Sequence, residues 1–257
     1  MSSWTPDAGL CVPVLDERDS LGPLLGEIAA ALEGARYTVC LVDDGSTDGT
    51  AELVRAAAER DPRIVLLQRP RGGPGCRRGG ASRAGLEWLL SHTGHRVFVD
   101  LDADGANDPG ELAAGIRQVD AGGADVAIAS KYVAGSRVAG RPLLRRLGSR
   151  LYSGLLRLLM GSAVRDFSNS YRFYSRAAAE LLLRVPPRYE GPVYLAEMLA
   201  VWLSAGLRVV ELPPVYGARR GGASKVTLGD AVAGFAGAVH VGWLYRRGFY
   251  RAAPLRG

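Results

Sequence analysis

The first half of the chain alternates short apolar runs with longer segments of helical composition, and this alternation limits the fold more than any other feature. Strands that alternate with helices of this length are typical of a mainly parallel sheet covered by helices on both faces. The apolar runs that we predict as strands cover residues 10–15, 37–42, 64–67, 96–99 and 124–129. The segments that we predict as helices cover residues 20–32, 47–60, 81–90 and 108–121. We therefore expect an α/β fold.

The second half of the chain changes character. Residues 143–160 form a leucine-rich run that carries four arginines, and we predict a helix there. Further helices are expected at residues 193–203 and 228–245, with a strand at residues 207–212. A chain of 257 residues can hold one α/β domain with an appendage. We predict a domain over residues 1–226 and a C-terminal helical extension over residues 227–257, with helices that pack on the sheet or lie at a membrane surface.

Carboxylates follow two of the predicted strands at the point where each strand ends. Asp100, Asp102 and Asp104 stand at alternate positions directly after the fourth apolar run, and Asp43 and Asp44 follow the second. In an open α/β sheet, ligands bind outside the carboxyl ends of the strands. Alternating carboxylates there suit a hard divalent cation, which takes oxygen ligands and keeps several waters. A solvated acidic turn is the alternative, because Asp, Gly and Asn are common turn residues.

The chain carries a net charge of +6, and Lys131 and Lys225 are its only lysines, so arginine supplies nearly all of the positive charge. Because arginine binds phosphate through two parallel hydrogen bonds, this composition suits a phosphorylated ligand or an anionic membrane surface. Genomic base usage is an alternative origin of the arginine content. We expect no nucleic-acid partner, because the sequence has no helix-turn-helix, zinc knuckle or aromatic RNA-binding pattern.

The three cysteines and three histidines are widely spaced, which argues against a disulfide framework and a zinc site. The N-terminus lacks a basic region followed by an apolar core, so we expect no signal peptide. No run of about 18 uncharged apolar residues occurs, so we expect no transmembrane helix. These features predict a cytoplasmic protein, with a peripheral position at the inner face of the cell membrane as a further option.

Six segments, read in order along the chain, resemble the motifs of glycosyltransferase family two. Within that family they are most similar to the polyprenyl-phosphate glycosyltransferases, such as the dolichyl-phosphate mannose synthases. The segments cover residues 12–17, 42–50, 102–104, 130–133, 166–172 and 219–225. The second segment alone is a strong marker of the family. The resemblance implies the GT-A nucleotide-sugar fold over nearly the whole chain.

In this family the first two segments hold the nucleoside of the donor. The resemblance implies that the pocket for the base and ribose is lined by Pro13, Glu17, Asp43, Asp44 and Ser46. Carboxylates can accept hydrogen bonds from ring N–H groups or ribose hydroxyls, and the glycine of the second segment lets the backbone approach a ligand. The same residues would also suit a strand that ends in a polar turn before a capped helix.

The resemblance assigns Asp102 and Asp104 to the family's metal-binding carboxylate pair, with Mg²⁺ or Mn²⁺ as the cofactor. The sequence departs from the family at Ala106, where these synthases often carry a glutamine. A third oxygen ligand from this position is therefore missing. Asp100, Asn107 or additional water would have to replace it.

The remaining segments are implied to hold the two phosphate groups. Lys131 stands where the family has an arginine that meets the acceptor phosphate, and Arg145 and Ser149 lie at the spacing of further phosphate contacts, although Arg145 would also suit a solvated helix face. Asp166 and Arg172 keep the outer positions of the fifth segment and are candidate catalytic residues. A loop over the donor pyrophosphate is implied by Arg219, Ser224 and Lys225.

The resemblance predicts an inverting, metal-dependent transfer of a sugar from a nucleoside-diphosphate sugar to a polyprenyl phosphate, with GDP-mannose as the expected donor. A phosphate monoester is already a nucleophile near neutral pH, because its second pKa is about 6. A small natural-product or peptide acceptor is the alternative. It would need a base, for which Asp166 and Glu197 are the candidates. A non-catalytic protein that binds a nucleotide-sugar or a membrane is the third hypothesis, and Ala106 is its only support.

Overall fold

The computed structural model describes residues 4–72, 77–140, 142–217 and 228–251, and a seven-stranded sheet forms its centre. The strands of this sheet are β1 (Asp7–Val14), β2 (Arg36–Asp43), β3 (Ile64–Gln68), β4 (Val97–Asp100), β5 (Val126–Ala129), β7 (Arg172–Ser175) and β8 (Val209–Leu212). Their order is β3-β2-β1-β4-β7-β5-β8. Every neighbouring pair is parallel except the two pairs that involve β7, so the prediction of a mainly parallel sheet is confirmed. A second sheet pairs β6 (Arg137–Val138) with β9 (Val215–Tyr216).

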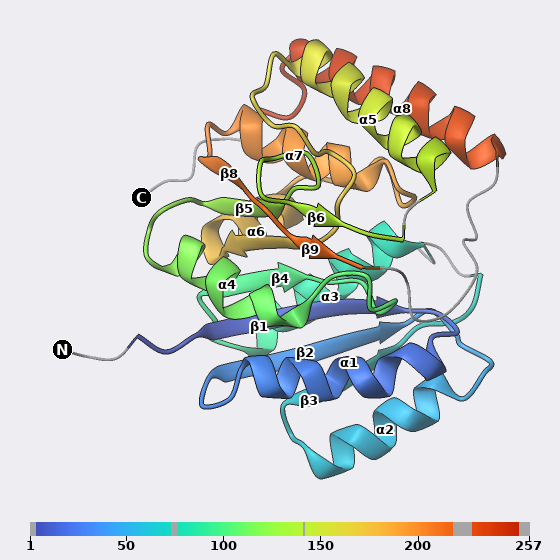
Figure 1. Ribbon diagram of the computed structural model, residues 1–257, viewed down its shortest axis with the longest axis vertical. Helices are drawn as coiled ribbons and strands as arrows, with labels where there is room; N and C mark the ends of the chain where they lie inside the picture. Colours follow the sequence, from blue (N-terminus) through green and yellow to red (C-terminus); the bar gives the residue numbers. More distant parts are fainter. Residues whose placement is uncertain (1–3, 73–76, 141, 218–227, 252–257) are drawn as a thin grey trace.

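Helices cover both faces of the sheet, as the alternation predicts (Figure 1). The helices are α1 (Arg18–Ala31), α2 (Thr50–Arg60), α3 (Arg78–His92), the 3₁₀ helix η1 (Pro109–Glu111), α4 (Leu112–Asp120), α5 (Leu143–Met160), α6 (Arg176–Arg184), α7 (Tyr194–Ser204) and α8 (Leu228–Arg246). Helices α1, α2 and α4 pack on one face of the sheet, and α3, α6 and α7 pack on the other.

Successive side chains of the central strands point to opposite faces of the sheet, because side chains alternate along a strand. In β1, Leu10 and Val12 are buried in the hydrophobic cluster beneath α1 and α4, whereas Cys11 belongs to the cluster beneath α3. In β4, Val99 and Phe98 divide between the two clusters in the same way. Both faces are therefore apolar, which explains why these strands appear in the sequence as continuous apolar runs.

Helix α2 begins at Thr50 instead of the predicted residue 47, because the turn before it has its own hydrogen bonds. Gly49 adopts a left-handed conformation with a φ of +92°. The carboxylate of Asp48 accepts a hydrogen bond from the amide of Thr50 at 3.0 Å, which is the contact of an Asx turn. Residues 47–49 therefore stay outside the helix.

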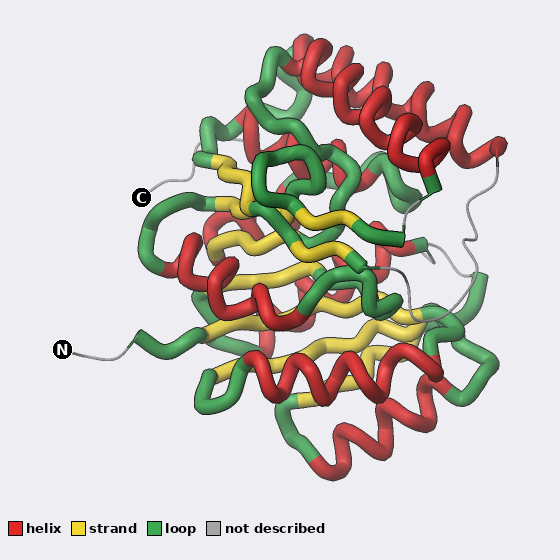
Figure 2. Tube along the Cα trace, in the orientation of Figure 1, coloured by secondary structure: helices red, strands yellow, loops and turns green. Residues whose placement is uncertain are grey.

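Helices α5 and α8 lie side by side and form an outer layer at one end of the molecule, at the top of Figure 2. Helix α8 also packs on α7, and its buried residues Ala238, Val241 and Leu244 join the hydrophobic cluster of α3, α6 and α7. The division of the chain at residue 226 stays a prediction. Within the described ranges, no helix is both long enough and apolar enough to cross a bilayer.

Candidate active site

The sheet brings the acidic strand ends to one edge. Val14, the last residue of β1, pairs with Asp43 of β2, and Cys11 of β1 pairs with Asp100 of β4. Because these three strands are parallel, their carboxyl ends meet at the same edge, where ligands of open α/β sheets bind. The acidic segments that follow β2 and β4 therefore leave the sheet together, as the sequence predicts.

Asp43 is fully buried and holds the turn that follows β2. One of its carboxylate oxygens accepts from the amide of Ser46 at 2.9 Å and from its hydroxyl at 2.5 Å. The Ser46 hydroxyl accepts in turn from the amide of Asp16 at 2.9 Å, which ties this turn to the segment after β1. The second oxygen of Asp43 is buried with no hydrogen-bond partner among the described residues. A buried acceptor without a partner is costly, so this oxygen suits a ligand that donates a hydrogen bond.

The other predicted nucleoside residues lie at the same edge. Glu17 directly precedes α1, and its amide donates to the hydroxyl of Thr50 at 3.0 Å. Pro13 occupies the second-to-last position of β1. Asp44 lies 3.5 Å from the guanidinium of Arg69, which follows β3. The structure thus brings all of the predicted nucleoside residues into one group.

Gly45 is required in the turn after β2 for a reason that the sequence did not indicate. Its φ is +85°, and a Cβ atom there would lie 2.7 Å from the backbone nitrogen of Arg71. Any side chain at this position would therefore collide with the segment after β3. The structure shows the approach of another part of the chain at this glycine, and the approach of a ligand stays a prediction.

The predicted metal ligands Asp102 and Asp104 follow β4, and contacts with other residues fix both side chains. One oxygen of Asp102 accepts from the hydroxyl of Ser170 at 2.5 Å, and the other contacts the guanidinium of Arg78. Asp104 is buried, and one of its oxygens accepts from the amide of Ala106 at 3.0 Å. The two carboxylates, which we call the acid pair, are therefore positioned by hydrogen bonds and an ion pair from three parts of the chain.

Asp100, the first acid of the run, is not part of this pair. It is fully buried, lies among residues of α3 and α7, and accepts from the hydroxyl of Tyr174 at 3.4 Å. Burial raises the pKa of Asp100, although the nearby arginines oppose the shift. Within the described residues, no group of three or more acidic, histidine or cysteine side chains could hold a metal. A cation at the acid pair would therefore depend on phosphate oxygens and water as well, which is usual for Mg²⁺.

Two residues that follow the acid pair, Ala106 and Asn107, are the next candidates for a third metal ligand. Ala106 supplies no side-chain oxygen. Asn107 is only 1% exposed, and neither polar atom of its side chain has a hydrogen-bond partner among the described residues. Buried amides normally have a partner, so this side chain suits a ligand contact. The two carboxylates and the amide of Asn107, which follows Asp104 by three residues, are oxygen ligands of the kind that Mg²⁺ or Mn²⁺ takes.

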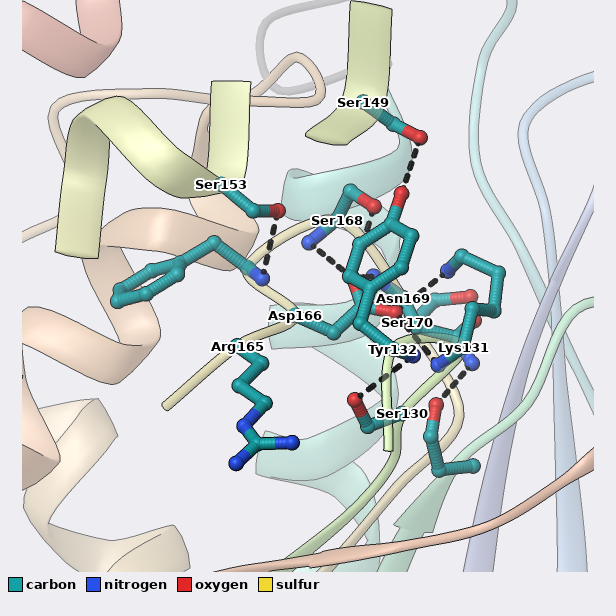
Figure 3. A network of polar contacts seen from close by, with 12 residues as sticks. Ser130, Lys131, Tyr132, Ser149, Ser153, Arg165, Asp166, Ser168, Asn169 and Ser170 are labelled. Carbon is teal, nitrogen blue, oxygen red and sulfur yellow. Dashed lines mark hydrogen bonds and ion pairs between the residues drawn. The ribbon is translucent and has the colours of Figure 1, made fainter. Parts of the chain in front are cut away.

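A buried ion pair forms the centre of the predicted acceptor side (Figure 3). The ammonium of Lys131 lies 2.9 Å from the carboxylate of Asp166, and the two side chains are 3% and 0% exposed. The same carboxylate accepts from the amides of Lys131, Ser168 and Asn169. Burial opposes ionisation of Asp166, but Lys131 and these amides outweigh it and hold the pKa of Asp166 below its usual value. Asp166 is therefore an ionised partner of Lys131 whose acceptor positions are already filled.

Arg172, the other candidate catalytic residue of this segment, is also fully buried. Its guanidinium donates to the carbonyl oxygens of Asn169 at 2.9 Å, Leu195 at 2.7 Å and Phe167 at 3.3 Å. These bonds join the loop at residues 166–170 to the start of α7. The arrangement makes Arg172 a positioning residue for that loop, and a direct contact with substrate stays a prediction.

Helix α5 is joined to the acceptor side through two serines. The hydroxyls of Ser149 and Tyr132 form a hydrogen bond, and the Ser153 hydroxyl accepts from the amide of Phe167 at 3.1 Å (Figure 3). Arg145 lies about one turn before Ser149 on the same helix and is exposed. The structure therefore brings Ser149 into the network around the buried ion pair, with Arg145 on the adjoining surface.

The predicted pyrophosphate residues Arg219, Ser224 and Lys225 lie outside the described residues. The chain that leads to them is anchored beside the acid pair. Gly217 donates its amide to the carbonyl of Ala106 at 2.8 Å, and Tyr216 forms a backbone bridge with Asn107.

Sequence reasoning missed two residues of the site, Arg78 and Tyr194. Arg78 is the first residue of α3, and its Nε donates to the hydroxyl of Tyr194 at 2.9 Å. Arg78 lies in a segment rich in glycine and arginine, residues 69–80, and nothing in the sequence distinguishes it from the other arginines there. The contact with Asp102 arises only when the sheet places α3 beside the end of β4.

Solved structures support the fold. The chain resembles glucosyl-3-phosphoglycerate synthase from Mycobacterium tuberculosis in complex with Mn²⁺, UDP-glucose and phosphoglyceric acid. The TM-score is 0.63 at 18% identity, over 95% of this chain and 80% of that chain. The complex of the same enzyme with UDP gives a TM-score of 0.61 at 19% identity, over 93% and 80% of the two chains. At this identity the likeness shows the fold alone, and it confirms the expected GT-A nucleotide-sugar fold.

Three relatives cover most of this chain. It is 33% identical to the polyprenol monophosphomannose synthase of Mycolicibacterium smegmatis, over 84% of this chain and 79% of that protein. It is 30% identical to the undecaprenyl-phosphate mannosyltransferase of Micrococcus luteus, over 86% and 89%. It is 32% identical to the undecaprenyl-phosphate 4-deoxy-4-formamido-L-arabinose transferase of Edwardsiella ictaluri, over 84% and 62%. The model of glycosyl transferase family 2 matches residues 10–183. The chain therefore belongs to glycosyltransferase family 2 and is a glycosyltransferase.

Proposed function

We propose that the protein transfers a sugar, with inversion, from a nucleoside-diphosphate sugar to a polyprenyl phosphate at a membrane surface. All three relatives are named for a polyprenol or undecaprenyl phosphate. Two of them are named for mannose, so GDP-mannose is the donor that we propose first. The third is named for a modified arabinose, so other donors belong in the test.

One contact carries this proposal, the hydrogen bond between Ser170 and Asp102. Asp102 belongs to the acid pair at the donor edge of the sheet. Ser170 ends the loop that begins at Asp166, which Lys131 holds in place. The 2.5 Å bond therefore joins the two parts of the chain that we propose for the donor and the acceptor. A diphosphate bound at the acid pair and a phosphate near Lys131 would be neighbours, and transfer between two bound reactants requires that proximity.

A phosphate acceptor suits this site because its candidate bases are already engaged. Asp166 is the ionised partner of Lys131. Glu197 accepts from two backbone amides and from the hydroxyl of Tyr250. A phosphate monoester has a second pKa of about 6 and attacks without a base. A hydroxyl group on a small natural product or peptide would need one, so we do not favour that acceptor.

We propose that Asp102 and Asp104 hold Mg²⁺ or Mn²⁺. The cation would neutralise the charge that develops on the departing nucleoside diphosphate. Arg219 and Lys225 lie outside the described residues and follow Gly217 in the sequence, and the amide of Gly217 donates to the carbonyl of Ala106. We expect them to contact the same diphosphate.

The outer layer of α5 and α8 supports a position at the membrane surface. Helix α5 exposes a row of leucines between 48% and 82%, namely Leu143, Leu144, Leu147, Leu151 and Leu158. On α8, Val239 and Trp243 are each 50% exposed. Apolar surface of this extent marks an interaction site, and arginines beside it favour anionic headgroups. A bilayer is the occupant that would also present a polyprenyl phosphate to Arg145 and Lys131.

The test is a transfer assay with purified protein, vesicles that contain a polyprenyl phosphate, and labelled GDP-mannose or UDP-glucose. We expect labelled lipid in the presence of Mg²⁺ or Mn²⁺, and none in EDTA. Transfer only to water or to a soluble acceptor would contradict the lipid acceptor. Undiminished transfer in EDTA would contradict the metal requirement.

A further inference from the structure

Arg78 brings a fixed positive charge to the acid pair. It extends from the first turn of α3, and its guanidinium contacts one oxygen of Asp102 while Ser170 donates to the other at 2.5 Å. Tyr194, the first residue of α7, accepts from the Nε of Arg78 at 2.9 Å and fixes the direction of the side chain. One oxygen of Asp102 thus has a hydrogen bond from Ser170, and the other has the charge contact with Arg78.

The surroundings strengthen this contact. The side chains of Arg78 and Asp102 are 30% and 20% exposed, so water screens the pair less than it screens a surface ion pair. The carboxylates of Asp100 and Asp104 also attract the positive charge of Arg78. Since arginine cannot lose its proton in a protein, Arg78 stays charged, and its effect on Asp102 changes only if the side chain moves.

We propose that Arg78 is the resident counter-ion of the acid pair, which yields Asp102 to the divalent cation when a nucleoside diphosphate is bound. The inference rests on the metal site of the proposed function. A guanidinium and a divalent cation at the same carboxylate oxygen repel each other, so Arg78 opposes cation binding while it remains on Asp102. Phosphate oxygens offer the guanidinium an equivalent anionic partner.

The exchange couples the cation to the nucleotide. The acid pair binds the cation weakly while Arg78 occupies Asp102, and more tightly once the diphosphate takes the guanidinium. Thermodynamic linkage makes the effect reciprocal, so the cation also tightens nucleotide binding. After transfer, the return of Arg78 to Asp102 favours release of the cation and the nucleoside diphosphate together.

The experiment measures Mn²⁺ binding by electron paramagnetic resonance on the full chain, with and without GDP or UDP. Arg78→Gln removes the charge but keeps a polar side chain, and Arg78→Met is the second uncharged variant in case the first does not fold. Without nucleotide, we expect either variant to bind Mn²⁺ about tenfold more tightly, because one opposing charge is gone. With nucleotide, the difference shrinks or reverses, because the variants have lost a phosphate contact.

Two further variants separate this role from a structural one. Arg78→Lys keeps the charge and should stay near the wild-type Mn²⁺ affinity. Arg77→Gln removes the exposed neighbouring charge at the cap of α3 and should also leave the Mn²⁺ affinity unchanged. A merely structural Arg78 would instead make Arg78→Lys and Arg78→Gln alike.

Equal or weaker Mn²⁺ binding by the folded uncharged variants, measured without nucleotide, overturns the counter-ion role. Absence of Mn²⁺ binding in the wild type and in every variant, with nucleotide present, overturns both this role and the proposed metal site. Failure to transfer sugar to a polyprenyl phosphate leaves these binding measurements intact, so it contradicts only the proposed acceptor.

Discussion

At the residue scale, the ion pair of Lys131 and Asp166 stabilises the loop that we propose for the acceptor side. The pair is almost completely excluded from water, and the amides of Ser168 and Asn169 also depend on the Asp166 carboxylate. Removing one member of such a pair leaves an uncompensated buried charge. The resemblance to a phosphate-binding segment predicts a positive charge at Lys131, but it does not predict that this charge pairs with Asp166.

We expect Lys131→Met to destabilise the fold by about 3–5 kcal/mol, because Asp166 then loses its cation while it remains buried. Urea unfolding monitored by circular dichroism measures this loss. The double variant Lys131→Met/Asp166→Asn should recover much of it, since the carboxylate is also gone. An unfolding midpoint of Lys131→Met at the wild-type urea concentration would mean that the pair does not support the fold.

We expect Asp104→Asn to lower the transfer rate about 10²–10³-fold, as happens when one stabilising contact to developing charge is removed. Asp108→Asn is the matched control. This exposed acid accepts from the amide of Gly110 at 2.8 Å outside the acid pair, and its variant should keep most of the rate. Initial rates at saturating donor are compared for the two variants. Equal rates would remove Asp104 from the metal site.

At the scale of elements, the periodicity of apolar residues predicts helices and strands that depend on local sequence. It misses those that depend on contacts with distant parts of the chain. Helix α5 has the predicted bounds of residues 143–160, because its leucines recur at helical spacing. Strand β7 and helix α6 escape the prediction. β7 begins with a buried arginine, Arg172, whose guanidinium needs the carbonyl of Leu195 from α7. Such a partner leaves no pattern in the neighbouring sequence.

The same division applies to the site. Asp102 and Asp104 can be predicted because a strand and its acidic end are adjacent in sequence. Arg78 could not be predicted, because its contact with Asp102 depends on how α3 packs beside β4. The pairing of Lys131 with Asp166 also joins residues that are distant in sequence, so the resemblance located both residues without revealing that they bind each other.

We expect the double variant Leu144→Gln/Leu151→Gln on α5 to reduce binding to anionic vesicles without changing the unfolding midpoint. The two leucines are 82% and 67% exposed, so they contribute to a surface and not to the core. The net charge is unchanged, which separates the apolar contribution from that of the arginines. Vesicle flotation at low salt measures the effect. Undiminished flotation would place the membrane contact elsewhere, and a lower unfolding midpoint would show that the leucines support the fold.

At the scale of the whole molecule, the amino edge of the sheet has its own polar cluster, opposite to the active edge. His95 is buried there, with its ring nitrogens 2.5 Å from the carboxylate of Asp7 and 2.9 Å from the hydroxyl of Thr38. Burial lowers the pKa of His95, although Asp7 opposes the shift. The folded protein therefore takes up a proton at this residue less readily than the unfolded chain does.

This difference predicts a pH dependence of stability. As the pH falls below about 6.5, the unfolded chain protonates His95 first, so the free energy of unfolding decreases until the pH reaches the lowered pKa of the folded state. Urea unfolding between about pH 5 and pH 8 measures the slope, since histidine titrates in this range. His95→Gln should remove that part of the slope. An identical slope in the variant would assign the dependence to other groups.

The reversed direction of β7 has a consequence for how this architecture can diversify. Because β7 is antiparallel to β4, with Arg172 opposite Asp100, the segment that precedes β7 lies at the active edge. In the parallel strands β1, β2 and β4, the segment that follows each strand lies at this edge. In the proposed function, the part of the acceptor side from Asp166 to Ser170 therefore precedes β7, whereas the acid pair follows β4. Insertions or exchanges between α5 and β7 could change the acceptor without altering the register of the sheet. Such exchanges offer a route for evolution, or for loop grafting, to new acceptors on an inherited donor site.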